Sequence, residues 1–188
     1  MSIRLIIMGP PGVGKGTQAN ILKDTFKIPH LSTGEILRNE IKINSDIGKI
    51  SKNYINDGLF VPDNILIQIV EQHITKPDSN NGYILDGFPR NLQQVENLKV
   101  LLYEINQTID VAISLTAKKN EVIKRLIKRS KNSGRSDDTY EIISKRQDVY
   151  WEQTAPIIEY YQKLGILKEV NGLGTIEEIT HRILEVIK

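Results

Sequence analysis

Apolar and polar residues follow one another along the chain in two patterns that predict strands and helices in succession. The run 3–8 is apolar and rich in β-branched residues, as in a buried parallel strand. From 15 to 26 the apolar positions recur at helical spacing instead. The two patterns then repeat to the end of the chain. Strands are predicted at 3–8, 28–31, 83–86, 110–115 and 166–170, and helices at 15–26, 33–43, 46–56, 62–75, 91–104, 118–131, 139–164 with a break near Pro156, and 175–187.

Strands that alternate with helices predict an α/β fold, with a five-stranded parallel sheet covered by helices on both faces. Ser32 followed by Glu35 has the form of a capping box, so Ser32 is predicted to cap the helix that follows it. Pro62 fits the first turn of another helix. In sheets of this kind ligands bind at the carboxyl ends of the strands, so we expect the functional residues directly after strands.

The global composition indicates one compact domain and excludes several classes of protein. A chain of 188 residues builds one good core but is too short for two ordinary domains. No apolar run reaches the ~20 residues of a membrane span, and the N-terminus leads directly into a predicted strand, so neither a membrane segment nor a signal peptide is expected. With no cysteine, disulfides and thiolate–metal sites are excluded, which suits the cytoplasm. A net charge of +2 does not indicate nucleic-acid binding.

The segment between the first strand and the first helix has the composition of a phosphate-binding loop. It reads Gly9-Pro10-Pro11-Gly12-Val13-Gly14-Lys15-Gly16-Thr17. Glycine lets the main chain approach an anion closely, and a helix N-terminus presents N–H groups and a favourable dipole to it. Lys15 adds a positive charge for the β- and γ-phosphates. A glycine turn that serves packing alone is the structural alternative, but it needs no lysine in this register.

The loop departs from the common P-loop pattern in one respect. A Ser or Thr usually follows the lysine directly as a magnesium ligand. Here Gly16 occupies that position and the hydroxyl comes one residue later, at Thr17. This form occurs in adenylate kinases and related nucleoside monophosphate kinases. It indicates that substrate oxygens and water hold most of the metal's coordination positions.

A second motif, Asp86-Gly87-Phe88-Pro89-Arg90, follows the third predicted strand. A carboxylate at the end of a buried strand can hold a hydrated Mg²⁺, and an arginine at the start of the next helix can bind a phosphate through two donors. The alternative is an Asp/Arg pair that only caps a helix.

Two further segments have a functional and a structural interpretation. Thr33 and Arg38 can grip an acceptor nucleotide and its phosphate, or belong to a capped surface helix. Leu59, Phe60 and Val61 can offer main-chain groups to a base edge, or only connect two helices.

Arginines are concentrated around the polar loop 132–138. Arg125 and Arg129 share one helix face, Arg135 lies in the loop and Arg146 in the following helix. Planar cations of this kind neutralise the charge that spreads over a phosphoryl group during its transfer. Asp138 with Glu141 is predicted to cap the helix after the loop. Lysines of the same region fit an ordinary solvated face; they are Lys118, Lys119, Lys124, Lys128 and Lys131.

Taken together, these motifs resemble those of the adenylate kinase family in its short-lid form, in order and in spacing, over the whole chain. The motifs are G-P-P-G-V-G-K-G-T, L-S-T-G-E-I-L-R, D-G-F-P-R and S-G-R-S-D-D. The resemblance implies a P-loop NTPase-type three-layer α/β/α core (1–31, 62–128 and 140–188), a small helical AMP-binding insertion (32–61) and a short lid (129–139). Longer lids in this family carry a four-cysteine zinc site, so no zinc is expected here.

The resemblance also implies a role for each matching residue. Gly12, Val13, Gly14, Lys15, Gly16, Thr17, Arg129 and Gly174 are expected to bind ATP. Thr33, Arg38, Leu59, Phe60, Val61, Gly87, Phe88, Pro89, Arg90 and Gln94 are expected to bind AMP, and Arg135 and Arg146 the transferred and acceptor phosphates. Lys15, Arg90, Arg129, Arg135 and Arg146 are the expected catalytic residues, and Asp86 is expected to hold Mg²⁺ through water.

Two alternatives to an adenylate kinase are weighed on particular residues. UMP/CMP kinases usually have Ala in place of Thr33 and Asn in place of Gln94, and a Gln amide can offer a donor and an acceptor to an adenine edge. A non-catalytic nucleotide-binding module needs no set of cations aimed at a migrating charge. The expected reaction is therefore ATP plus AMP to two ADP, by a monomeric, cytoplasmic enzyme. His30, His73 and His181 are expected to be structural or exposed.

Overall fold

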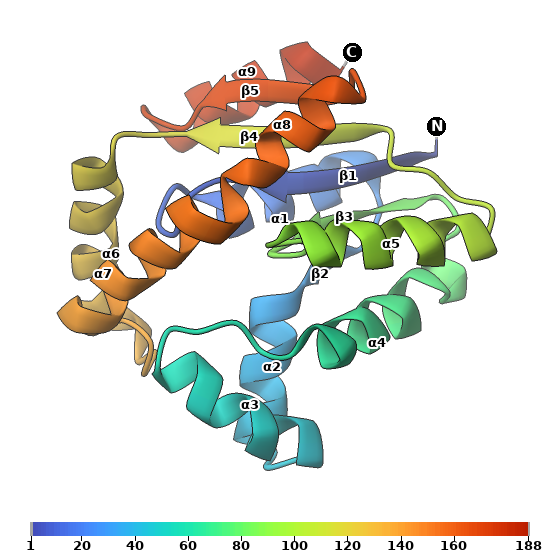
Figure 1. Cartoon of the computed structure of the whole chain (residues 1–188). Coiled ribbons are helices and arrows are strands. Elements are labelled where there is room, and N and C mark those ends of the chain that lie inside the picture. Colours follow the sequence, from blue (N-terminus) through green and yellow to red (C-terminus); the bar gives the residue numbers. More distant parts are fainter. Residues whose placement is uncertain (1, 188) are drawn as a thin grey trace.

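The five strands form one parallel sheet with the order β2–β3–β1–β4–β5. The computed structural model describes residues 2–187, apart from the side chain of Asn132. Because β1 lies in the middle of the sheet, the chain winds outward to β2, returns through β3 and then continues to the other edge (Figure 1). The strands are β1 (Ile3–Met8), β2 (His30–Ser32), β3 (Gly82–Asp86), β4 (Val111–Thr116) and β5 (Leu167–Asn171).

The predicted order of strands and helices is confirmed, with shifted ends. The α-helices are α1 (Lys15–Phe26), α2 (Thr33–Lys42), α3 (Asp46–Asn56), α4 (Asp63–Ile74), α5 (Leu92–Glu104), α6 (Lys119–Ser133), α7 (Tyr140–Val149), α8 (Pro156–Lys163) and α9 (Ile176–Ile187). A short 3₁₀ turn, η1 (Pro77–Ser79), and a π-helical turn, η2 (Tyr150–Thr154), complete the described elements. The break predicted near Pro156 is this π turn, which separates α7 from α8.

Helices cover both faces of the sheet, as the alternating pattern predicts. One face packs against α4, α5 and α8, through buried side chains such as Leu66, Leu98 and Ile157. The other packs against α1, α6 and α9, through Leu22, Val122 and Ile183. Because the central strands are covered on both sides, they are apolar almost throughout. Helices α2 and α3 project from the sheet below the strand ends (Figure 1).

Two predicted helix starts differ in detail from the structure. Ser32 does precede α2, but its side chain makes no capping hydrogen bond, because the residue still pairs as the last residue of β2. Pro62 is the N-cap of α4 rather than part of its first turn, since its ψ of 137° is extended. The register places Ser32 beside Asp86, and Asp86 beside Ile7. The ends of three strands therefore meet at one edge.

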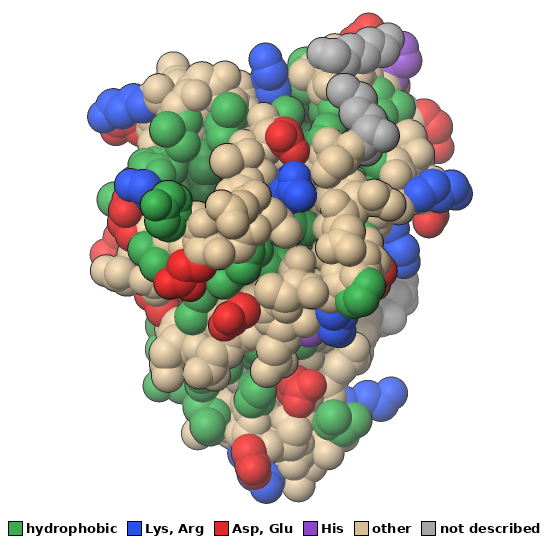
Figure 2. Space-filling view, turned by 90° about the vertical axis from the view of Figure 1, so that its right-hand side faces the viewer, with side chains coloured by type: hydrophobic (Ala, Val, Ile, Leu, Met, Phe, Trp, Pro, Cys, Tyr) green, Lys and Arg blue, Asp and Glu red, His purple; other side chains and the backbone are tan. Residues whose placement is uncertain are grey.

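Charged side chains of both signs are mixed on the face shown in Figure 2, without a region of a single sign. This agrees with the small net charge of +2. Within residues 2–187, no helix is long and apolar enough to cross a bilayer.

Candidate active site

The carboxyl ends of the strands open into one cleft of about 670 Å³. Almost all predicted site residues line it. They are Gly12, Val13, Gly14, Lys15, Gly16, Thr17, Thr33, Arg38, Leu59, Phe60, Val61, Asp86, Gly87, Pro89, Arg90, Arg129, Arg135, Arg146 and Gly174. Phe88 and Gln94 do not line it, and both are buried. Among the described lining residues, seven are Lys or Arg and three are acidic, so the cleft favours an anionic ligand.

The loop after β1 takes a conformation that depends on two of its glycines. Gly12 and Gly14 have φ of +89° and +109°, values that side chains rarely adopt. Space excludes a side chain at Gly12 as well, because a Cβ there would lie 2.7 Å from the Val122 carbonyl of α6. The helix α1 begins directly at Lys15. Its first N–H groups therefore face the cleft, as an anion site requires.

The carbonyls of this loop are occupied by side-chain donors. Lys15 Nζ donates to the Gly9 oxygen at 2.7 Å and to the Pro10 oxygen at 3.2 Å. Arg125 Nη1 donates to the Val13 oxygen at 3.1 Å and to Gly172, after β5, at 2.9 Å. A carbonyl and the N–H of its peptide point in opposite directions, so the bond from Arg125 to the Val13 oxygen turns the Gly14 N–H away from Arg125.

Lys15 lies in a strongly cationic environment. Burial lowers the pKa of its ammonium group to about 8; Asp86 opposes the shift, while Arg90, Arg146 and Arg129 add to it. An anion among these cations favours the charged form of the lysine. The site is therefore built to become fully charged when phosphate enters.

Asp86 ends β3 with its carboxylate against His30. His30 Nε2 lies 3.3 Å from Asp86 Oδ2, and its Nδ1 lies 3.0 Å from the Asn20 Oδ1. Burial acts to raise the Asp86 pKa, but the hydrogen bond from His30 and the charge of Lys15 outweigh it and hold this pKa below its usual range. Within the described residues, no three His, Cys, Asp or Glu side chains form a group that could hold a metal. A single ionised carboxylate suits a hydrated Mg²⁺ but not a protein-caged ion.

Arg90 precedes α5 in the loop after β3 rather than starting the helix, because Asn91 is the N-cap. Its Nε donates to the Gly87 oxygen at 2.6 Å, and its guanidinium lies 5.3 Å from the centre of the Phe60 ring. Burial lowers the Arg90 pKa to about 10, with the charge of Arg146 adding to the shift. These contacts fix the stem of Arg90 while its terminal nitrogens remain directed to the ligand cleft.

Thr33 and Arg38 enter the cleft from α2. The Thr33 hydroxyl donates to the Gly87 oxygen at 2.9 Å, which ties the start of α2 to the loop after β3. Gly87 has a φ of +80°, a conformation that favours glycine, and a Cβ there would also displace Arg90 Nη2, which lies 2.7 Å from that position. Burial and the charge of Arg135 lower the Arg38 pKa, against the pull of Asp137.

Both ends of the Gln94 side-chain amide form hydrogen bonds within the protein. Its Oε1 accepts from the Arg90 N–H at 2.6 Å, and its Nε2 donates to Asp63 at 2.6 Å. Because a carboxylate oxygen accepts, the Gln94 atom nearest Asp63 is assigned as the nitrogen. Asn91 donates to the same carboxylate at 3.3 Å. Gln94 therefore supports the main chain of Arg90, whatever further contact it makes with a ligand.

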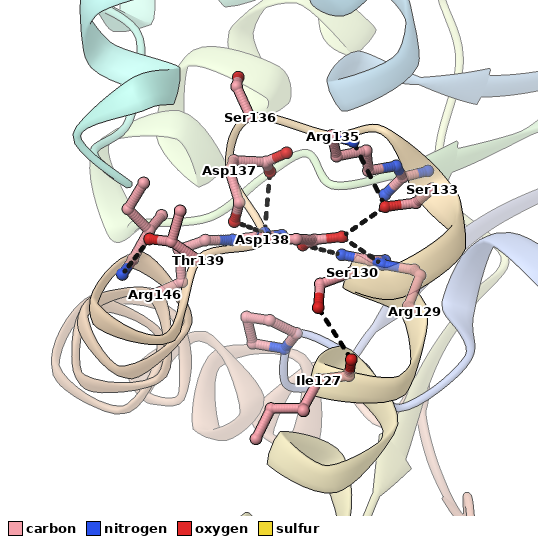
Figure 3. Close-up of polar contacts among 12 residues, drawn as sticks. Ile127, Arg129, Ser130, Ser133, Arg135, Ser136, Asp137, Asp138, Thr139 and Arg146 are labelled. Atoms are coloured by element: carbon pink, nitrogen blue, oxygen red, sulfur yellow. Dashed lines mark hydrogen bonds and ion pairs between the residues drawn. The ribbon is translucent and has the colours of Figure 1, made fainter.

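Two aspartates of the predicted lid (129–139) hold Arg129 and, from α7, Arg146 (Figure 3). Asp138 accepts two bonds from Arg129, at 2.8 and 2.6 Å, and one from the Ser133 hydroxyl at 3.1 Å. Arg146 contacts Asp137 at 2.8 Å and Asp138 at 3.3 Å. Burial opposes ionisation of Asp138, but its bonds to Arg129 and Ser133 keep its pKa below the usual range. The prediction that Asp138 caps α7 is therefore wrong: Thr139 caps it, accepting from the Ile142 N–H.

The lid also contacts the segment predicted to bind AMP. The Ser136 hydroxyl donates to Asn56 at 2.8 Å across 80 positions of sequence. Beside it, a Cβ on Gly58 would lie 3.1 Å from Ile142 and 3.2 Å from Arg146. The loop after α6 and the end of α3 are thus in direct contact.

Sequence reasoning missed three residues at the site. His30, expected to be structural or exposed, lies against Asp86, and its place directly after a Pro in β2 was the only local signal. Arg125 had been grouped with the lid arginines but bonds the phosphate-binding loop. Gln147 of α7 donates to the Pro11 oxygen at 2.8 Å, and no motif marks it.

Comparison with known proteins identifies the family. The model of the adenylate kinase family matches residues 7–166. The chain is 45% identical to the adenylate kinase of Leptospira biflexa over 98% of this chain and 99% of the relative. It is 42% identical to the adenylate kinases of Nocardioides sp. (98% and 97%) and Stenotrophomonas maltophilia (99% and 100%).

The chain belongs to the adenylate kinase family. As a member of the adenylate kinase family it is a nucleotide-binding phosphotransferase that transfers phosphoryl groups between ATP and AMP. The expected family and α/β fold are thereby confirmed. A cleft rich in cations at the carboxyl edge of the sheet is the geometry that this activity needs.

Proposed function

We propose that the protein catalyses the reversible, Mg²⁺-dependent transfer of the terminal phosphoryl group of ATP directly to AMP, giving two ADP without a covalent enzyme intermediate. The observation that carries the proposal is the single cleft into which the P-loop, the end of β3 and the lid arginines all open. The transferred group loses one oxygen bond to the donor and gains one to the acceptor phosphate. The protein then needs to position two nucleotides and neutralise charge.

The donor is proposed to bind along the P-loop, with its adenine toward Gly174. Residues 12–17 are suited to the β- and γ-phosphates through the ammonium of Lys15 and the N–H groups at the start of α1, although the Val13 N–H is bonded to the Pro10 oxygen. Arg129 reaches the same side of the cleft from α6.

The acceptor is proposed to bind between α2 and the loop after β3. Arg38 and Arg90 are suited to its phosphate, Thr33 and the main chain of residues 59–61 to its base, and residues 87–90 to its ribose and phosphate side. Gln94 is proposed to reach the adenine edge; its orientation, fixed by Asp63, supports a defined donor and acceptor order.

Mg²⁺ is proposed to be held by Asp86 through water and by phosphate oxygens. Asp86 forms no ion pair with a described Lys or Arg, and Thr17 lies exposed on the same cleft wall. The ion would supply charge neutralisation on the phosphates when bound. Lys15, Arg90, Arg135 and Arg146 neutralise the rest, and the lid excludes water from the transfer.

An acceptor panel tests this function. The purified protein is given MgATP with AMP, CMP, UMP or GMP, and the nucleoside diphosphates are separated. Rapid formation of ADP from AMP alone is expected. A preference for CMP or UMP would indicate a pyrimidine nucleotide kinase, and no transfer despite bound ATP would indicate a non-catalytic nucleotide-binding module.

Gln94 offers a sharper test of the acceptor side. Gln94→Ala is expected to weaken AMP more than ATP, and the neighbouring Gln93, which is exposed on α5, provides the matched control Gln93→Ala. Equal losses for both nucleotides would remove Gln94 from the acceptor site. We also propose a monomeric, cytoplasmic enzyme, in keeping with the resemblance to short-lid relatives. Sedimentation measures the oligomeric state.

A further inference from the structure

Gln147 is a buried polar residue that the proposed chemistry does not use. It follows Arg146 on α7 and is 0% exposed. Its Nε2 donates to the Pro11 oxygen of the P-loop at 2.8 Å, whereas its Oε1 has no hydrogen-bond partner among the described residues. A buried oxygen without a partner is unfavourable, and an apolar side chain of the same size would avoid it. The donor atom therefore points to a role beyond packing.

The bond fixes one peptide plane of the phosphate-binding loop. Pro10 and Pro11 have no N–H, so Gly12 provides the first main-chain donor after Gly9. In a trans peptide the C=O and the N–H point in opposite directions. When the Pro11 oxygen is held toward α7, the Gly12 N–H of the same peptide points in the opposite direction, away from α7.

This plane needs an external anchor more than its neighbours do. Gly12 has φ of +89° and no Cβ, so a rotation of the plane before it meets little local resistance. The Gly9 and Pro10 oxygens are held by Lys15 of the adjoining helix, and the Val13 oxygen by Arg125 of α6. Gln147 is the anchor that comes from α7, the helix whose Arg146 lines the cleft and contacts Asp137.

We propose that Gln147 is a positioning residue for the phosphate donor. It orients the Gly12 N–H toward the donor phosphates and ties the P-loop to the helix that carries Arg146. The inference deepens the proposed function and rests on it in taking ATP as the ligand. It assigns Gln147 an effect on the donor site that the acceptor site does not share.

The test is the variant Gln147→Met, which keeps the length of the side chain but has no donor. Calorimetric titration is expected to give a Kd for ATP about fivefold higher, as for the loss of one hydrogen bond. The Kd for AMP is expected to change by less than about twofold on the same reasoning. In ¹⁵N spectra, the Gly12 amide signal is expected to shift in the unliganded variant.

Ser79→Ala is the matched control, because the buried Ser79 hydroxyl also donates to a main-chain oxygen, at 2.9 Å, but lies away from the cleft. It is expected to leave both nucleotide affinities unchanged. If Gln147→Met does not fold, Gln147→Leu is measured instead. An unchanged ATP affinity, or equal losses for ATP and AMP, would overturn the inference. The titrations need no turnover, so they remain decisive even if the acceptor panel shows no transfer.

Discussion

The P-loop and the lid hold their charged and polar groups in opposite ways. In the P-loop, the side chains of Lys15 and Arg125 bind main-chain oxygens, and no described carboxylate forms an ion pair with either of them. At the predicted lid, Arg129 and Arg146 of α7 bind the carboxylates of Asp137 and Asp138 (Figure 3). The loop is therefore prepared for phosphate, whereas the lid arginines must share or exchange their partners when phosphate arrives.

The largest effect is expected for Lys15→Met, which removes the positive charge of the P-loop. Removal of the ammonium leaves the transferred charge without its nearest cation and frees the Gly9 oxygen. Turnover is expected to fall on the order of 10³-fold, with a folded protein by circular dichroism. A near-normal kcat would show that the loop acts without its lysine.

A smaller effect is expected for Asp138→Asn, which weakens the ion pairs of the predicted lid. The substitution replaces the carboxylate that pairs with Arg129 and Arg146 by a neutral amide. A charge-assisted hydrogen bond contributes about 2 kcal/mol. We expect a loss of stability of about this size and a fall in kcat of roughly tenfold. Denaturant unfolding and steady-state kinetics measure the two.

Asp148→Asn is its control, because Asp148 pairs with Lys119 on the surface. Surface pairs of this kind contribute little, so this variant should match the unsubstituted protein. Equal behaviour of the two variants would mean that the lid aspartates do not organise the arginines.

The pH dependence of ATP binding tests the role of Lys15 in the P-loop. The free Lys15 ammonium has a pKa of about 8, and bound phosphate raises it. Above about pH 8 binding therefore takes up a proton, and the affinity falls as the pH rises through that value. Near pH 6.5 the lysine is already charged, so no Lys15 proton is taken up. Calorimetry in buffers of different ionisation enthalpy measures this uptake, and Lys15→Met should abolish it.

The same shift has the opposite consequence for the unliganded fold. The pKa of Lys15 lies below the 10.5 of an ordinary lysine, so unfolding takes up a proton between about pH 8 and 10.5. The contribution of Lys15 to stability therefore rises with pH in that window and is least favourable below it.

The smallest effect is expected for Ser136→Ala, which removes the bond between the lid and Asn56. Because the bond is exposed, stability should change by less than about 0.5 kcal/mol. The KM for AMP should change by less than about twofold on the same grounds. Ser130→Ala, which removes a bond within α6, is the control. A tenfold rise in KM for Ser136→Ala alone would show that this contact governs closure.

Sequence patterns predicted the elements well because the buried strands and amphipathic helices carry their periodicity locally. The P-loop was readable for the same reason, since residues 9–17 are contiguous. The cap of α7 was not, because Asp138 and Thr139 are both good caps and only the fold shows that Asp138 is occupied by Arg129.

Contacts between distant segments had no signature in the chain. His30 reaches Asp86 across 56 positions, and Gln147 reaches Pro11 across 136. A histidine or glutamine has the same local appearance on a surface as in a site. Such pairs depend on which strands lie side by side, which the order of elements alone does not determine.

The π turn after α7 places the only tryptophan of the chain where it can report on the lid. Trp151 is 47% exposed and meets the ring of Tyr150 edge-on at 5.2 Å, five positions after Arg146. Tyr150 itself lines the cleft. The tryptophan fluorescence of the protein therefore arises from one indole, in the turn that follows α7. Because the chain has no cysteine, a single cysteine introduced at Ser136 would accept a dye alone, and energy transfer between the two would follow opening and closing in real time.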